Sequence, residues 1–496
     1  MKQTSSMLIV VYVLLSVTTC FADTTISDDI VVDTIWGSNE SVYVIDRNIS
    51  VADTSTLTIL PGVTILMDEG VAITVKGTLA AQGIPESTIR VTGKTITSHV
   101  LAPPPEPAEG EVLSEEVEPV YIDEVTTLLP KGFVFEPGSR GVLSYISIDH
   151  ATDPIEGIDA SIAIDNAILA DAITGIHLTG GVLSVLNTLF MSIVVPAKIG
   201  LSVDFSHDNN TFTDTQYPGW NFFGDGYNQD VHLVAGDGVY ILSSSLSIAA
   251  EHSITIDPGA TLLLANNVSV NVYGKLTAQG TADEPIAIAP LLPTMRSSVF
   301  VMSDDPIVFE HVNYSLGEEL FFAQTNHITI AHSTFVKSPV AGFASTARIS
   351  DTTFSDLPND AALSFWGNAK VEGDHITIHT VDTGIEIFNE SSLVLSNADV
   401  TDTYNGIQIF GASTAAISHS HITQSENTGI AIYNTEMLAS KITVSYSEIA
   451  HTDYGMFITY QKPGDIAVAR TSFHDNTVAV FVKIMVQPLG NLNYCK

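Results

Sequence analysis

The sequence predicts an all-β fold, a parallel β-helix in which the chain winds through about 22 residues per coil. Three observations predict it: a gapless internal duplication, a shorter repeat filling the second half, and apolar positions that alternate without a helical period. A repeat this short cannot bury a core of its own. It must therefore stack on its neighbours to form a solenoid.

The duplication relates residues 41–84 to residues 238–281 at a constant offset of 197. Short alternating runs of Val, Ile, Leu and Thr lie between the shared turn residues, which is typical of strands joined by turns. The sequence therefore predicts two β-helix units. The shared positions are Val42/Val239, Tyr43/Tyr240, Pro61-Gly62/Pro258-Gly259, Gly77/Gly274 and Ala81-Gln82-Gly83/Ala278-Gln279-Gly280.

In the shorter repeat, a small residue precedes an apolar one every 20 to 26 residues, and an alternating strand such as IEIF, IQIF or IAIY follows. The missing Cβ of glycine would let successive coils stack closely. A β-sandwich or propeller is the competing all-β interpretation, but it would show frequent hairpin turns and no single-coil period. The copies are Gly342-Phe343, Ala362-Leu363, Gly384-Ile385, Gly406-Ile407, Gly429-Ile430, Gly455-Met456 and Ala479-Val480.

The lead-in VYVI…LTILPGVTI…ITVKGTLAAQG and the coils NTGIAIYN and NGIQIF resemble right-handed β-helix repeat proteins of bacterial surfaces, the pectate-lyase-like superfamily. The resemblance covers nearly all of the mature chain and implies a right-handed helix. It does not imply one activity, because that superfamily includes lyases, glycosidases, epimerases, adhesins and surface proteins. The Asn-Thr-Asp and Gly-His-Gly motifs of its glycosidases do not occur here. Asp149-His150 superficially resembles an Asp-His strand of pectate lyases, but without their basic residues it is interpreted as an ordinary coil.

Residues 1–22 are interpreted as an export signal, with Lys2 before the apolar stretch Leu8–Val17 and Ala22 at the cleavage site. A lipoprotein interpretation centres on Cys20, but the two threonines before it fit a lipidation box poorly. No second apolar stretch is long enough for a membrane helix. We therefore expect a soluble mature protein that is secreted, periplasmic or on the cell surface. Cleavage would leave Cys495 as the single cysteine, so no intramolecular disulfide is expected.

The predicted units are residues 23–230 and 231–496, with a junction around residues 204–227. Residues 101–120 are rich in Pro and Glu and should form an exposed loop that leaves the solenoid.

Acidic residues outnumber basic ones by 56 to 18, giving a formal charge of −38. A surface this negative repels nucleic acids and anionic lipids, so neither is expected as a partner. Neutral glycans, cations or a salty habitat fit the charge better.

Equivalent positions of successive coils should form columns. Aligning seven coils on their strand ends predicts one inward apolar column and, two residues earlier, an inward column of mostly small side chains. The strand ends are Phe335, Phe354, Ile378, Val400, Ile422, Ile449 and Phe473. The small column is Ser333, Thr352, Ile376, Ala398, Ser420, Ser447 and Thr471.

Two polar columns should point outward between these positions. Three residues before the strand end stand His332, Asp351, His375, Asn397, His419, Tyr446 and Arg470. One residue before it stand Thr334, Thr353, Thr377, Asp399, His421, Glu448 and Ser472.

The densest polar patch stacks Asp399, His421 and Glu448, with Tyr446 and Arg470 beside them. Two carboxylates would raise the pKa of the histidine, and the set could abstract a proton from a sugar and stabilise the resulting charge. Alternatively it could hold a divalent cation or bind a glycan. The simplest alternative is a solvated face on which mixed charges relieve repulsion.

The sequence thus favours a non-catalytic, secreted or surface β-helix that presents a face for glycan or protein binding. The binding face would comprise His332, Asp351, His375, Asn397 and His419. The alternative is a polysaccharide lyase, epimerase or hydrolase that uses His421, Asp399, Glu448, Tyr446 and Arg470. No dedicated metal ligands are assigned and no cofactor is certain, although Ca²⁺ fits the acidic surface. The expected partner is a polysaccharide or a surface protein.

Overall fold

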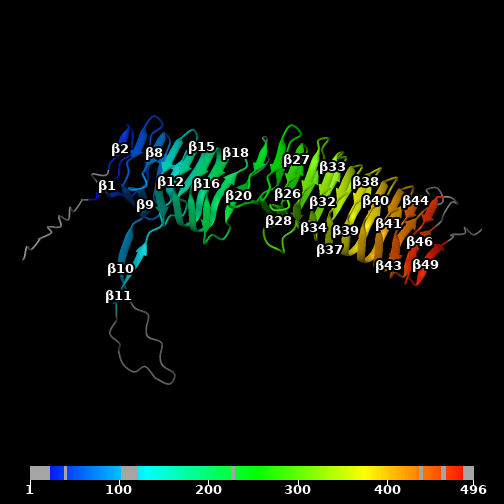
Figure 1. Ribbon diagram of the computed structural model, residues 1–496. Helices are drawn as coiled ribbons and strands as arrows, with labels where there is room; N and C mark the ends of the chain where they lie inside the picture. The colour runs from blue at the N-terminus through cyan, green and yellow to red at the C-terminus, as the bar shows by residue number, and fades with distance from the viewer. Residues whose placement is uncertain are drawn as a thin grey trace, which may run out of the picture.

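The computed structural model describes residues 23–37, 42–101, 121–224, 230–434, 440–459 and 465–483. Every element among these residues is a strand, and the strands wind into a parallel β-solenoid of about 19 turns at roughly 22 residues each (Figure 1). The predicted fold class is therefore confirmed. The segment predicted as an export signal and residues 102–120 lie outside the described residues. No helix within the described part is long and apolar enough to cross a membrane.

The strands from the first coil to the junction belong to one large sheet, apart from one two-stranded arm. They are β1 (Thr24–Ile26), β2 (Thr34–Trp36), β3 (Val42–Ile45), β4 (Ile49–Val51), β5 (Thr56–Ile59), β6 (Thr64–Met67), β7 (Ala72–Val75), β8 (Thr78–Gln82), β9 (Ile89–Gly93), β12 (Gly132–Phe135), β13 (Arg140–Ser144), β14 (Ile146–Asp149), β15 (Ile155–Asp165), β16 (Ile168–Leu186), β17 (Leu189–Gly200), β18 (Val203–Asp208), β19 (Thr211–Thr213) and β20 (Gly219–Phe223).

The same sheet continues to the last coil. Its later strands are β22 (Val239–Leu242), β23 (Leu246–Ile248), β25 (Thr261–Leu264), β26 (Ser269–Val272), β28 (Ile286–Pro290), β29 (Ser297–Val301), β31 (Val312–Tyr314), β32 (Gly317–Ala323), β34 (Thr334–Val336), β35 (Val340–Phe343), β37 (Thr353–Trp366), β39 (Thr377–Ile387), β41 (Asp399–Phe410), β43 (His421–Tyr433), β45 (Glu448–Ala450), β46 (Tyr454–Thr459), β48 (Ser472–His474) and β49 (Val478–Lys483).

A separate sheet forms the remaining wall of the second half. Its strands are β21 (Val231–Leu233), β24 (Ser253–Ile256), β27 (Lys275–Gln279), β30 (Ile307–Glu310), β33 (Ile328–Ala331), β36 (Thr346–Ser350), β38 (Lys370–Asp374), β40 (Ser392–Ser396), β42 (Thr414–Ser418), β44 (Lys441–Ser445) and β47 (Ile466–Ala469).

Each coil of the second half has three straight segments separated by corners. In one coil, β38 is followed by the first residues of β39, and the rest of β39 begins after Thr380. Thr380 has φ of 57°, and His375 before β39 has φ of 50°. A single residue in the left-handed region thus turns the chain at each of these two corners.

The predicted columns are in register. Consecutive strand-end residues from Phe335 to Phe473 are paired partners in the parallel ladder. The first six are fully buried, so the inward apolar column is confirmed. One copy of the short repeat was misaligned: Val340, and not Phe343, pairs with Leu363.

The small inward column is held by hydrogen bonds along the helix axis. The Ser420 hydroxyl donates to the Ser418 carbonyl at 2.8 Å and accepts from the Ala398 N–H of the preceding coil at 3.2 Å. The Ser447 hydroxyl makes the same pair of bonds one coil later, with the Ser445 carbonyl and the Ser420 N–H. These buried hydroxyls satisfy corner backbone groups, which makes the column structural.

The two duplicated segments form the same hydrogen bonds at the same offset. The Tyr43 hydroxyl accepts the Gly37 N–H at 3.0 Å, and the Tyr240 hydroxyl accepts the Val234 N–H at 3.0 Å. In each segment an aspartate also accepts a backbone N–H of the following coil. Thr56 N–H donates to Asp33, and Ser253 N–H donates to Asp230.

A two-stranded antiparallel arm leaves the first coils of the solenoid (Figure 1). It consists of β10 (Thr95–Leu101) and β11 (Tyr121–Thr127), paired from Thr95/Thr127 to Leu101/Tyr121. The expected excursion from the solenoid therefore begins before the Pro- and Glu-rich segment.

The last coil of the first half meets the first coil of the second half through buried polar groups. His207 Nδ1 lies 2.8 Å from Asp237 Oδ1, and His207 Nε2 lies 2.7 Å from the Tyr240 hydroxyl. The side chains of His207 and Asp237 are only 5% and 7% exposed. Trp220 donates its indole N–H to the Asp237 carbonyl. A cavity of about 350 Å³ beside this cluster is lined mainly by apolar side chains such as Leu201.

Candidate functional site

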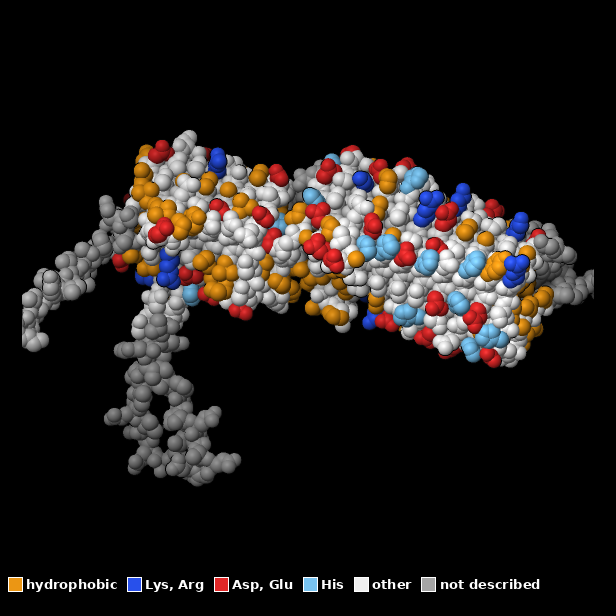
Figure 2. Space-filling model, in the orientation of Figure 1, with side chains coloured by type: hydrophobic (Ala, Val, Ile, Leu, Met, Phe, Trp, Pro, Cys, Tyr) orange, Lys and Arg blue, Asp and Glu red, His pale blue; other side chains and the backbone are white. Residues whose placement is uncertain are grey.

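The two outward columns lie side by side on one edge of the second half, and they are called the polar face here. It consists of His332, Asp351, His375, Asn397, His419, Tyr446 and Arg470 in the first column and Thr334, Thr353, Thr377, Asp399, His421, Glu448 and Ser472 in the second. The second column is in register through seven coils. Histidines gather in two lines over this half of the molecule (Figure 2).

The first column points outward because its residues lie at left-handed corners of the coils. Strand alternation was the expected cause, but every residue of this column is a corner residue with φ between 47° and 52°. The left-handed corner, rather than the pleat of a strand, turns these side chains to solvent. His311 has φ of 49° and stacks on His332 with ring centroids 4.9 Å apart, which extends the column by one coil.

The predicted stack of Asp399, His421 and Glu448 is in register, but only two of its members interact. His421 Nδ1 lies 2.8 Å from Glu448 Oε2. No hydrogen bond or ion pair joins Asp399 to His421 within the described part of the chain. The second partner of Glu448 is His474, whose Nε2 lies 2.6 Å from Oε1. The structure therefore brings together a His–Glu–His chain rather than a histidine between two carboxylates.

These contacts shift the protonation equilibria of the acidic and basic groups. Hydrogen bonds from His421 and then His474 hold the pKa of the Glu448 carboxyl below its usual range. Hydrogen bonds to Asp475 and then to Glu448 raise the pKa of the His474 imidazole. The charged forms of both groups are therefore favoured together.

Tyr446 and Arg470 interact along the helix axis. The Tyr446 ring stacks on His419, with centroids 5.0 Å apart and planes 3° from parallel. On its other side, the Arg470 guanidinium lies 5.1 Å from the ring centroid, and its Nη1 donates to the tyrosine hydroxyl. Arg470 therefore already interacts with Tyr446, in a cation–π arrangement.

The remaining residues of the predicted binding face pair with neighbouring acids. His332 Nδ1 lies 3.8 Å from Asp351 Oδ2. His375 Nδ1 lies 2.9 Å from Asp374 Oδ2, and Asn397 donates to the other oxygen of Asp374 at 2.8 Å. Hydrogen bonds from Ser396, then Asn397 and His375, hold the pKa of Asp374 below its usual range.

Most residues of the polar face are exposed, and the others are half-buried. The side chains of His332, His375 and His421 are 46%, 60% and 61% exposed. The two cavities that stand out lie elsewhere, at the junction of the halves and beside the arm near Arg90 and His150. This geometry suits contact with an extended or flat partner better than enclosure of a small molecule.

A third outward column consists of aromatic side chains that the sequence pattern did not single out. Phe388, Phe410 and Tyr433 stack on one another, with ring centroids 4.5 and 4.7 Å apart. Their signal was present in the last letters of IEIF, IQIF and IAIY. Because the rings cover one another's faces, they stabilise coil stacking rather than offering a platform for a sugar ring.

Comparison with models of protein families agrees with the fold. A family model described as a right handed beta helix region matches residues 318–478. No curated protein matches the chain significantly. Among solved structures, pectate lyase Pel9A is 13% identical over 47% of this chain and 71% of its own, with a TM-score of 0.22. The periplasmic alginate epimerase AlgG is 8% identical over 87% of this chain and 76% of its own, also with a TM-score of 0.22.

The parallel register and the matched region together define the class of the molecule, a parallel β-solenoid protein. More particularly, the chain is a right-handed β-helix protein. At such low identities and TM-scores, neither solved structure carries an activity over to this chain.

Proposed function

We propose that this protein is an exported, non-catalytic β-helix whose polar face binds a glycan rich in hydroxyl groups. The observation that carries the proposal is a ladder of exposed and half-buried donors and acceptors that is in register over seven coils. Neighbouring coils present equivalent groups about 4.8 Å apart. Such a repeat suits a polymer, which can form one contact per coil.

The charge of the molecule favours a neutral glycan over an anionic one. The chain carries a formal charge of −38, so an anionic polymer would be repelled over most of its surface. Imidazole, amide and phenol groups can hydrogen-bond sugar hydroxyls without a net charge on the ligand.

Export and two-unit organisation belong to the same proposal. The charged and apolar pattern of residues 1–22 supports secretion to the periplasm, the medium or the cell surface. The recurring hydrogen bonds of Tyr43 and Tyr240 support two units, residues 23–230 and 231–496, each beginning with the same lead-in.

The test is binding of the purified mature protein to neutral and uronate-containing polysaccharides, measured by calorimetry. A double variant, His419→Asn with Tyr446→Asn, removes both rings while keeping residues that tolerate the left-handed corner. We expect neutral glycan binding to weaken about tenfold, the loss of roughly one to two hydrogen bonds.

The control is His150→Asn, which replaces a left-handed histidine of the first half with φ of 54°. Its affinity should match that of the unmodified protein. Equal affinity of the double variant would contradict the proposed face, and a preference for uronates would contradict the proposed ligand class.

One observation favours the second candidate, a polysaccharide lyase, epimerase or hydrolase. Glu448 orients His421 by holding Nδ1, and no described residue bonds to its Nε2, the arrangement that a general base requires. Incubating the protein with the same polysaccharides and analysing products distinguishes the candidates. Turnover that disappears in His421→Ala would establish catalysis and overturn the non-catalytic proposal.

A further inference from the structure

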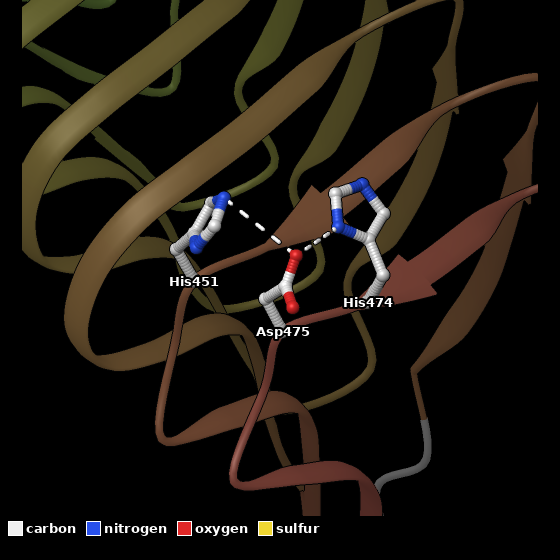
Figure 3. A group of neighbouring side chains, drawn as sticks. All are labelled: His451, His474 and Asp475. Carbon is white, nitrogen blue, oxygen red and sulfur yellow. Dashed lines mark hydrogen bonds and ion pairs between the residues drawn. The ribbon is translucent and has the colours of Figure 1, made fainter.

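Two imidazoles and one carboxylate converge at the end of the polar face, outside the residues singled out from the sequence. His451, His474 and Asp475 each offer one ligand atom, and these atoms all lie within 4.8 Å of one another. Figure 3 shows both rings directed at the same carboxylate. His474 Nδ1 lies 2.8 Å from Asp475 Oδ2, and His451 Nε2 lies 3.9 Å from the same oxygen.

The backbone explains why these side chains meet. Ala450 and His474 are register partners, so His451 and Asp475 occupy the same corner of successive coils. Both corner residues are left-handed, with φ of 56° and 52°. The corner turns His451 and Asp475 outward one above the other, and His474 precedes the second of them.

We propose that His451, His474 and Asp475 bind a divalent transition-metal ion, with Zn²⁺ as the representative ligand. Two nitrogens and one carboxylate oxygen form a donor set that suits zinc, copper or nickel. Ca²⁺ suits the set poorly, because it requires six to eight oxygen ligands. The three proposed ligands lie outside the residues of the polar face, so metal binding does not depend on the proposed glycan contact.

The distances are compatible with such an ion after small side-chain movements. Zinc ligands at about 2.0–2.1 Å in tetrahedral geometry lie roughly 3.3 Å from one another. His474 Nδ1 and Asp475 Oδ2, which are 2.8 Å apart, therefore need to separate by about 0.5 Å. The wider ligand pairs, at most 4.8 Å apart, need to close by about 1.5 Å at most. His451 and Asp475 are 55% and 64% exposed, so they have room to adjust and leave coordination positions for water.

An independent contact points to the same role. Glu448 Oε1 lies 2.6 Å from Nε2 of His474, the ring nitrogen opposite the one that faces Asp475. A carboxylate that holds the far nitrogen of a ligating histidine fixes the ring and directs the near nitrogen to the metal. Glu448 is itself held by His421 at 2.8 Å, so the support extends one coil further. Glu448 is thus assigned as a positioning residue.

The test is titration of the untagged full chain, first stripped with EDTA, with Zn²⁺ against a chromophoric chelator. We expect one ion bound per chain. The variants Asp475→Asn and His451→Asn should each weaken binding at least tenfold, because each removes one of three ligands. Asparagine is tolerated in the left-handed corner, so the coil should persist, and circular dichroism checks this.

The matched control is His375→Asn, a left-handed histidine of the polar face with its own acidic neighbour. It should bind Zn²⁺ as the unmodified chain does. Glu448→Gln should weaken binding less than loss of a ligand and shift the visible spectrum of the Co²⁺ form. No stoichiometric binding, or equal affinity in Asp475→Asn and His375→Asn, would overturn the assignment.

Discussion

At the scale of single residues, one backbone conformation decides what stands on the polar face. Asn, Asp and His enter the left-handed region more readily than most residues, and five of the seven corner residues of the first column are of these types. The corner therefore selects polar side chains before any ligand does. Tyr446 and Arg470 are the exceptions, and these two residues are bound to each other.

A β-branched residue at a left-handed corner should strain the backbone. His419→Val places a β-branched residue at φ of 50°, which should cost about 1–2 kcal/mol of stability. His419→Asn loses the same ring contact with Tyr446 but fits the corner, so the difference between the two variants isolates backbone strain. Urea denaturation monitored by hydrogen exchange in β42 and β43 measures it. Equal stability of the two variants would contradict a left-handed corner at this position.

At the scale of the element, glycines allow neighbouring coils to approach closely. Gly384, Gly406, Gly429 and Gly455 stack in successive coils, and a Cβ on any of them would meet backbone of the next coil. A Cβ on Gly406 would also lie 2.6 Å from Cγ2 of Ile422. The spacing of the coils at this corner thus depends on the absence of a side chain.

Gly406→Ala should therefore destabilise the second half by about 2–3 kcal/mol, the cost of overpacking a rigid core. Gly37→Ala provides the control, because a Cβ there would meet a single atom of Leu60 at 3.8 Å and φ is not positive. Its melting temperature by scanning fluorimetry should stay near that of the unmodified chain. Equal melting temperatures of the two variants would mean that the coils can separate at little cost.

Sequence reasoning recovered the elements better than it recovered the site. The strand ends from Phe335 to Phe473 were aligned correctly although coil length varies, because buried apolar positions anchor the register. Phe343 was misaligned, since its Gly-apolar pair matches the repeat by composition but lies three residues past Val340 in the ladder.

The corners and the side-chain contacts of the site could not be predicted from the sequence, because corners have no fixed sequence. His, Asp, Asn, Tyr, Arg, Thr and Gln all occupy left-handed corners here, so no motif marks them. Asp399 was expected to contact His421 from register alone, but register fixes Cα positions and leaves the rotamer free. For the same reason the contact between Glu448 and His474, which are 26 residues apart, could not be deduced from spacing.

At the scale of the whole molecule, a buried charged cluster joins the two halves. Asp237 accepts hydrogen bonds from His207 and from the Asn210 N–H at 2.9 Å. Burial acts to raise the pKa of Asp237, but hydrogen bonds from His207 and Asn210 outweigh it and hold the pKa below the usual 3.8. The ionised carboxylate therefore stabilises the junction.

The sign of this shift sets a pH dependence. The contribution of Asp237 is present above its unfolded pKa and is lost as the pH falls through the lower, folded value. Asp237→Asn should cost about 2–4 kcal/mol near pH 7, and the deficit should shrink below about pH 4. Thermal unfolding near pH 7 and below about pH 4 measures the effect. The control is Asp208→Asn, which replaces an exposed carboxylate. A deficit independent of pH would exclude an ionic role for Asp237.

The stacking of the coils also gives the molecule a fixed length along the solenoid axis. About 19 turns at about 4.8 Å each give an axis of roughly 90 Å. The antiparallel arm leaves near one end of this axis, and β46 and β49 lie near the other (Figure 1). No small ligand can touch both ends at once, so a partner engaged at both must be a polymer or an array. Binding at both ends at once would then give a higher overall affinity than either weak contact alone. The number of coils would set the distance between the two contacts.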